Sequence, residues 1–84
     1  MIPPAGRKEF DDEILLLISE KIKEMRKSKG YKSYETFALD NDLDRKQYWR
    51  LENGSNMTLR SLIKILKIHN VSLKKFFTDL KLEK

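Results

Sequence analysis

The chain has 84 residues, a length that supports one domain with a small core. It contains no cysteine, which excludes a disulfide framework and a thiolate metal site, and no apolar run approaches the roughly 20 residues of a membrane span. Residues 1–6 lack the basic start and apolar stretch of a signal peptide. A cytoplasmic protein without a membrane partner is therefore predicted.

The net charge of +5 is concentrated in one part of the chain. Residues 1–44 carry eight Lys/Arg against ten Asp/Glu, whereas residues 45–75 carry eight Lys/Arg against Glu52 alone. This density indicates a polyanionic partner, either duplex DNA or RNA. Charge by itself does not separate that interpretation from a solvated, lysine-rich surface, which is common in small soluble proteins.

The N-terminal part of the chain predicts a flexible arm followed by a long helix. Residues 1–10 contain two prolines and a glycine and are assigned to the arm. Asp11 and Asp12 are candidate N-caps of a helix that runs to Lys29 and is closed by Gly30. Its buried stripe, at intervals of three or four, is Ile14 or Leu15, Ile18, Ile22 and Met25.

Two short helices joined by a tight turn are predicted next. Ser33 caps a helix over residues 34–40, with Phe37 and Ala38 as its inward residues. The turn at residues 41–42 is Asn-Asp, and both residue types tolerate left-handed backbone geometry.

The third predicted helix, residues 44–53, has well-defined ends. Asp44 is a good N-cap, and Gln47 three residues later completes a D-x-x-Q capping box. Gly54 stands where a left-handed residue would end the helix.

The two sides of this third helix differ in character. At 100° per residue, Tyr48 and Leu51 share one side, which Leu43 can join from just before the helix. The opposite arc is basic and aromatic, with Arg45, Lys46, Trp49 and Arg50. A capped helix with such a face suits the major groove of DNA.

Two further helices complete the chain. Thr58 caps a fourth helix that ends at His69 and Asn70, and Ser72 caps a fifth. The inward residues are expected to be Leu59, Leu62, Ile63 and Leu66 in the fourth helix, and Leu73, Phe76, Phe77 and Leu80 in the fifth. No strand signal exceeds a few residues, so the predicted fold is all-α with five helices.

Most of residues 13–80 resembles the phage repressor/Cro-type helix-turn-helix proteins, also called the XRE family. The matching residues are Arg26, Phe37-Ala38, Arg50-Leu51-Glu52-Asn53-Gly54, Thr58-Leu59, Leu62, Val71-Ser72-Leu73 and Phe76-Phe77. The resemblance implies a compact five-helix bundle over residues 11–81, followed by a tail at 82–84. It also implies insertion of helix 44–53 into the major groove, usually by a dimer.

The resemblance further implies a set of DNA-contacting residues. Base edges would be met by Arg45, Lys46 and Arg50, with Trp49 beside them. Phosphate contacts would come from Tyr34, Asn53 and Asn56. The basic residues Arg60 and Lys64 of the fourth helix are also predicted to contact phosphates. Tyr34 replaces a glutamine that the family commonly has at the start of the second helix, and Trp49 has a core or dimer contact as its alternative role.

Glu52, the only acid in the basic half, is predicted to pair with Arg26 of the first helix. Its position near the end of the third helix and the family pattern both favour this partner. Such an ion pair would be structural and would orient the third helix without touching DNA. The alternative is an exposed glutamate without a fixed partner.

Catalytic and metal sites are not predicted. The single histidine, His69, lies beside a turn and is expected to be exposed, and no Gly-rich phosphate loop is present. Neither a catalytic triad nor a metal cluster can be assembled, so no enzyme activity and no cofactor are expected. Asp40, Asp42 and Asp44 resemble the start of a calcium loop, but the required glycine and final glutamate are replaced by Arg45 and Leu51.

The sequence therefore predicts a small transcriptional regulator that binds double-stranded DNA sequence-specifically as a homodimer. The candidate dimer seams are Leu16 and Leu17 or the stretch 76–82, of which the stretch is preferred. A stand-alone repressor, an antitoxin with a toxin partner and a controller of a restriction-modification operon remain open. The competing function is a protein-interaction module with the same fold, favoured by the apolar run at residues 14–18 and the acidic first half.

Overall fold

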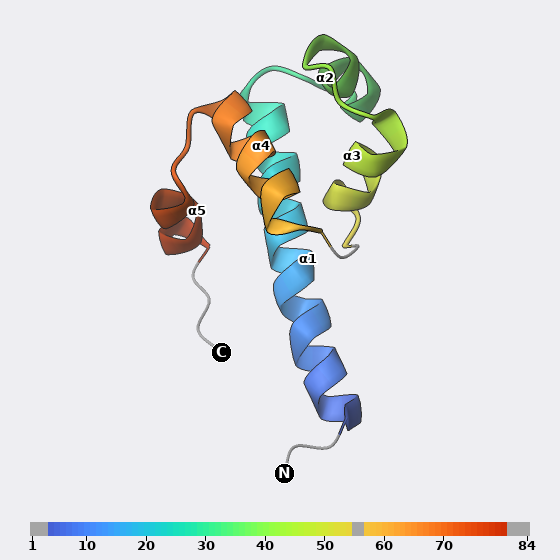
Figure 1. The fold of residues 1–84 in the computed structure, drawn as a ribbon, viewed down its shortest axis with the longest axis vertical. Helices are drawn as coiled ribbons and strands as arrows, with labels where there is room; N and C mark the ends of the chain where they lie inside the picture. Colours follow the sequence, from blue (N-terminus) through green and yellow to red (C-terminus); the bar gives the residue numbers. More distant parts are fainter. Residues whose placement is uncertain (1–3, 55–56, 81–84) are drawn as a thin grey trace.

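The computed structural model describes the backbone of residues 4–54 and 57–80, and side chains from residue 12 onward within those ranges. These residues form five helices and no strand, which confirms the predicted all-α fold (Figure 1). The helices are α1 (Pro4–Ser28), α2 (Tyr34–Asp40), α3 (Arg45–Glu52), α4 (Leu59–His69) and α5 (Leu73–Asp79). α3 packs on α1 and α2, α5 packs on α4, and the N-terminal half of α1 extends beyond the bundle (Figure 1).

The start of α1 differs from the prediction. The helix begins at Pro4, so the assignment of Asp11 or Asp12 as its N-cap is wrong, and residues 4–10 of the expected arm are helical. Proline is favoured at the first helical position because its φ is already helical and no N–H is needed there. At the opposite end the helix stops at Ser28, one residue before the predicted Lys29. Gly30 closes it as predicted, because it adopts a φ of 97° and its N–H donates to the Lys27 carbonyl at 3.0 Å.

The predicted caps of the other four helices are confirmed. In each, the cap side chain accepts a hydrogen bond from a backbone N–H in the first turn, and the caps are Ser33, Asp44, Thr58 and Ser72. The turn between α2 and α3 is also left-handed as expected, at Asp42 with a φ of 57°. There the Leu43 N–H donates to the Ala38 carbonyl at 2.8 Å, which brings the chain sharply back into α3.

The core is built around α1 and collects apolar side chains from all five helices. Its buried members are Ile18, Ile22, Phe37, Ala38, Tyr48, Leu51, Leu62, Ile65, Leu66, Phe76 and Leu80. Phe37 lies at an aromatic centre, 5.1 Å from the Tyr31 ring, 5.0 Å from the Tyr48 ring and 5.3 Å from the His69 ring. This cluster joins α2, α3 and the end of α4.

Four expected core positions in α4 and α5 are not buried. Leu59 is 60% exposed and Ile63 only half-buried, while Ile65 is buried in their place. Leu73 and Phe77 are also exposed, at 36% and 37%. A helical wheel identifies residues that share one side, but the width of the neighbouring elements decides how much of that side is covered. On α4 and α5 the covered stripe is narrower than the apolar side.

The expectation that His69 is exposed is wrong. Its ring is partly buried and stacks on Phe37 with an angle of 7° between the ring planes. The Nε2 atom is buried without a hydrogen-bond partner among the described residues. Burial lowers the pKa of the His69 imidazole, and the positive charge of Lys29 lowers it further. The charged residues Lys21 and Glu24 line the surface hollow next to the His69 ring, together with Lys29.

We expect the protein to lose stability when the pH falls below about 6.5, the ordinary pKa of histidine in an unfolded chain. Because the folded pKa of His69 is lower, the unfolded chain binds a proton first. As far as His69 is concerned, the free energy of unfolding should therefore be constant between about pH 7.5 and 9 and decline by at most about 1.4 kcal/mol per pH unit between the unfolded and folded pKa values.

Urea unfolding at pH 7.5 and 5.5 measures this effect. The chain has one histidine, so its titration dominates this pH range. A His69→Phe variant, which keeps an aromatic ring against Phe37, is the control and should show a much smaller decline. An equal decline in both proteins would show that His69 is not the responsible group.

Candidate nucleic-acid interface

The outer face of α3 exposes the basic and aromatic side chains that the sequence placed there. Tyr48 and Leu51 are buried against the core, whereas Arg45, Lys46, Trp49 and Arg50 are exposed on the other side. Trp49 is 47% exposed, so its indole is not a core residue of this chain. The Asp44 cap accepts a hydrogen bond from the Gln47 N–H at 2.9 Å and fixes the first turn of the helix.

A surface hollow of about 430 Å³ lies between the start of α2 and the outer face of α3. Its lining residues are Tyr34, Glu35, Arg45, Lys46, Trp49 and Arg50. Tyr34 is half-buried and packs against the core, with part of its surface open to this hollow. The structure thus brings together all four predicted base-contacting residues and one predicted phosphate-contacting residue.

The acidic member of this hollow, Glu35, was not selected from the sequence. Its Oε2 atom lies 3.1 Å from Arg45 Nη1 and accepts a hydrogen bond from it. Both side chains are more than half exposed, at 53% for Glu35 and 61% for Arg45. The ion pair therefore joins the first turns of α2 and α3 at the surface of the hollow.

The end of α3 is attached to α1 through a buried serine that sequence reasoning also missed. The Gly54 N–H, which follows the helix at a φ of 84°, donates to Ser19 Oγ at 3.0 Å. Ser19 is completely buried, although it stands among the apolar residues of the α1 stripe. A small polar residue within such a stripe is the signal that could have identified this contact.

The predicted pair between Arg26 and Glu52 is present. Arg26 Nε and Nη2 donate to the two oxygens of Glu52 at 2.7 Å and 3.1 Å, and both side chains are about 95% buried. Arg26 Nη1 also donates to the Tyr31 carbonyl at 2.9 Å. The hydrogen bond that Arg26 donates to Glu52 raises the pKa of the Arg26 guanidinium and outweighs the opposite effect of burial. One buried arginine thus connects α1, the loop before α2 and the end of α3.

Tyr48 is buried beside this ion pair. Its hydroxyl is buried and makes no hydrogen bond of acceptable geometry with the described residues. Burial raises the pKa of this hydroxyl, and the neighbouring Glu52 carboxylate raises it further. Tyr48 therefore stays uncharged and contributes packing to the anchored side of α3.

The remaining predicted phosphate contacts are less closely grouped. Asn53 donates through Nδ2 to the Trp49 carbonyl at 2.7 Å, so its amide helps to close the end of α3. Arg60 and Lys64 are exposed on α4, outside the lining of the α2–α3 hollow. Asn56 lies outside the described residues.

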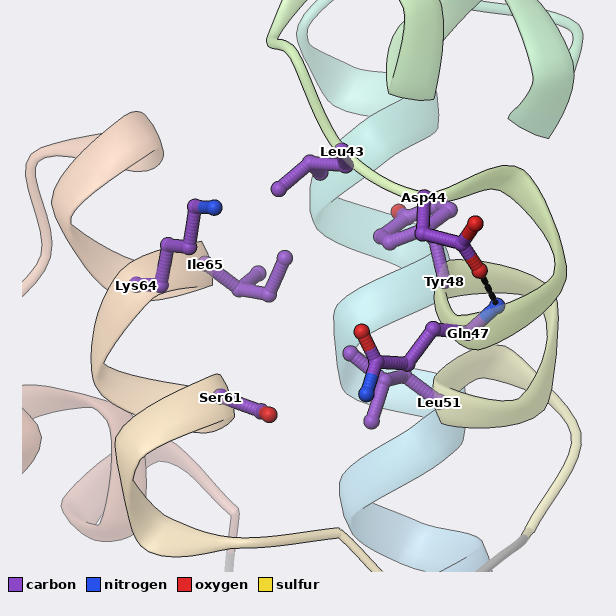
Figure 2. Close-up of a pocket in the computed structure, with 8 residues that line it drawn as sticks. All are labelled: Leu43, Asp44, Gln47, Tyr48, Leu51, Ser61, Lys64 and Ile65. Atoms are coloured by element: carbon purple, nitrogen blue, oxygen red, sulfur yellow. Dashed lines mark hydrogen bonds between the residues drawn. The ribbon is translucent and has the colours of Figure 1, made fainter.

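A second, much smaller cleft separates α3 from α4. Figure 2 shows Leu43, Asp44, Gln47, Tyr48 and Leu51 on the side of α3 and Ser61, Lys64 and Ile65 on the side of α4. Its volume is about 50 Å³, which accommodates a few water molecules. Ligand pockets have volumes of roughly 300 Å³ or more, so this cleft does not suit a small-molecule effector.

Apolar side chains of α4 and α5 are also exposed. Leu59, Leu73 and Phe77, here named the α4–α5 apolar surface, line an open hollow of about 510 Å³ together with Lys74 and Thr78. Phe77 keeps an edge-to-face contact with the buried Phe76 at 5.2 Å between ring centres. Part of the Phe77 ring is thus fixed in position while another part faces solvent.

Among the helices that the structure describes, none combines the length and apolar composition needed to cross a membrane. No protein-family model and no solved structure matches the chain. The chain is similar to the control protein C.MunI of Mycoplasma sp., with 37% identity over 73 residues. The match spans 86% of this chain and 99% of that control protein. The chain therefore belongs to the protein family of the control protein C.MunI.

Proposed function

We propose that this protein is a DNA-binding transcriptional regulator that inserts α3 into the major groove of duplex DNA. The observation that carries the proposal is the exposed face of α3, where Arg45, Lys46, Trp49 and Arg50 surround one hollow. Guanidinium groups on such a helix can donate to the O6 and N7 atoms of guanine, and an indole can contact a thymine methyl group.

The rigid attachment of α3 supports the same function. Its buried side is fixed to α1 through Arg26 and Ser19, while its outer side is left free of core contacts. A recognition element must keep its position within a fraction of an ångström for bidentate base contacts to form. The fold thus provides a helix that is fixed on one side and carries solvent-facing side chains on the other.

Family membership narrows the regulatory role. Of the three alternatives that the sequence leaves open, similarity to a control protein favours the controller of a restriction-modification operon over an antitoxin or a stand-alone repressor. The protein-interaction module is the competing function, and it requires no affinity for duplex DNA. The proposed regulator is cytoplasmic and needs no cofactor.

The proposed regulator acts as a homodimer. One short helix reads only a few base pairs, whereas a two-fold dimer places two copies of α3 about 34 Å apart in successive major grooves. The α4–α5 apolar surface is the preferred seam because its three large side chains are exposed together. Phe76 and Leu80 of the stretch 76–82 are buried in the core and are not available to the seam, and residues 81–82 lie outside the described residues.

Substitutions on α3 and α4 are expected to affect binding in different ways. Arg45→Ala or Arg50→Ala should cost about 1–3 kcal/mol on the preferred site and relax the choice at one base pair. Arg60→Ala or Lys64→Ala should weaken binding to all sequences similarly and reduce the salt slope by about one. The two classes separate base contacts from phosphate contacts.

The measurement starts from DNA selected by the wild-type protein out of a random duplex pool, followed by titrations at low and moderate salt. Lys67→Ala, which removes an exposed lysine of α4 that is not assigned to the interface, is the control. Unchanged site preference in the Arg45 and Arg50 variants would show that α3 is not the recognition helix. Absence of duplex binding by the wild-type protein would favour the protein-interaction module.

A further inference from the structure

We infer that Glu35 is a specificity-determining residue. Its carboxylate orients Arg45 for base contact and opposes binding to DNA that lacks a matching base for Arg45. The inference rests on the proposed DNA-binding function and concerns the same hollow. Glu35 is the only acid among the six residues that line it, beside Arg45, Lys46 and Arg50. An acid in this position requires an explanation because it faces the proposed site of a polyanion.

The exposure of the ion pair argues against a role in folding. Both side chains are more than half exposed, and ion pairs of this kind contribute little to stability. The buried pair of Arg26 and Glu52 already fixes α3 to the rest of the bundle. The Glu35 carboxylate and the Arg45 guanidinium are instead both accessible from the side that would face DNA.

The geometry of the pair leaves Arg45 able to contact a base. Only Nη1 of its guanidinium donates to Glu35, and a guanidinium carries five N–H donors in a rigid planar fork. Restricting this fork before binding reduces the conformational entropy that is lost when it meets the two acceptors of a guanine. Glu35 thus favours the bidentate contact without occupying all of the donors.

The charge of Glu35 acts in the opposite direction on other sequences. Non-specific binding depends on phosphate contacts, and a carboxylate beside the groove repels phosphates on every duplex. The ion pair with Glu35 also keeps the Arg45 guanidinium from contacting the sugar-phosphate backbone of the DNA instead of a base. Only a site with the correct base compensates for this repulsion, so Glu35 increases the ratio of specific to non-specific affinity.

The test replaces Glu35 with glutamine, which keeps the size of the side chain and removes its charge. Affinities are measured for the selected site and for random duplex between about 50 and 200 mM salt. Over this range the affinity that arises from phosphate contacts falls steeply as the salt concentration rises. Removal of one repulsive charge should strengthen random-duplex binding by about eightfold at 0.1 M salt and steepen the salt slope by about one. Affinity for the selected site should not rise, so the specificity ratio falls by about the same factor.

Two comparisons make this result specific to the pair. Glu20→Gln, an exposed acid of α1 outside the hollow, should leave the specificity ratio unchanged. In an Arg45→Ala background, Glu35→Gln should no longer change the ratio, because the oriented base contact is already lost. Circular dichroism of each variant confirms that the helices are intact.

An equal gain in affinity for the selected site and for random duplex would overturn the inference, since Glu35 would then act as a general charge. A change of the ratio that persists without Arg45 would overturn it as well. Failure of the wild-type protein to bind any duplex is a distinct result, which overturns the proposed function and this inference with it.

Discussion

Replacement of Glu52 by alanine is expected to lower the free energy of unfolding by about 3–5 kcal/mol. The substitution leaves the Arg26 guanidinium charged in a site where its side chain is only 5% exposed. A domain of this size has a total stability of roughly 5–10 kcal/mol, so the loss is a large fraction of the total and should lower the melting temperature by roughly 10 °C or more. Arg26→Ala should be similarly damaging because it leaves the Glu52 carboxylate without its partner.

Chemical denaturation of both single variants and of the double variant measures the coupling between the two residues. A pair in direct contact should give a coupling energy well above about 1 kcal/mol. Additive effects of the two substitutions would show that the two side chains do not stabilise one another. Arg26→Met combined with Glu52→Leu should recover much of the lost stability, because apolar residues of similar volume avoid the cost of burying charge.

The protein contains a matched control for this experiment. The pair of Arg45 and Glu35 has the same chemistry and a similar distance of 3.1 Å, but it is exposed. Glu35→Ala should therefore cost less than about 1 kcal/mol. A similar loss for the buried and the exposed pair would show that burial is not the cause.

Replacement of Phe77 by lysine is expected to produce a folded monomer with operator affinity reduced by about 100- to 10,000-fold. Phe77 is 37% exposed on the α4–α5 apolar surface, so a lysine head can reach solvent in the monomer. In the proposed dimer the same charge would be buried at the seam without a partner. Loss of the dimer removes the second α3 from the DNA, and linked binding of two modules is worth a factor of this order.

Analytical ultracentrifugation at tens of micromolar protein, together with titration of the selected site, measures both effects. Leu16→Lys is the matched control, because Leu16 is 50% exposed on α1 and represents the other predicted seam. Leu80→Lys is unsuitable, although Leu80 lies in the predicted seam at residues 76–82, because it is only 9% exposed and belongs to the core. If Leu16→Lys dissociated the dimer and Phe77→Lys did not, the dimer seam would lie on α1. A wild-type monomer whose preferred site has no inverted repeat would refute dimerisation.

The ends of most helices could be predicted from the sequence because they depend on hydrogen bonds within a few residues. The four confirmed cap side chains each satisfy an N–H of their own helix, and Gly30 supplies the left-handed residue after α1. The exposed face of α3 could also be predicted from the sequence, because the helical period separates Tyr48 and Leu51 from the basic residues. The start of α1 at Pro4 differs from the predicted arm, because proline is common in extended segments and also favours the first turn of a helix.

The coverage of each apolar side was decided by tertiary packing. Leu59 and Ile65 have the same apolar character, yet Ile65 is buried and Leu59 is exposed because the neighbouring helices cover only one stripe of α4. His69 was expected outside, but the approach of α4 to Phe37 makes it part of the aromatic cluster. A sequence pattern contains no information on how closely a second helix approaches.

Most contacts between residues distant in the sequence were also decided by tertiary packing, with one exception. The pairing of Arg26 with Glu52 was predicted because Glu52 is the only acid of its region and because the family pattern favours that partner. Ser19 with Gly54 and Glu35 with Arg45 carry no comparable signal. The sequence by itself determined the five helices, the N-caps of α2 to α5 and the exposed basic and aromatic face of α3. The packing of α1, α2 and α3 decided which polar groups meet, because hydrogen bonds between helices require distances that only the assembled bundle provides.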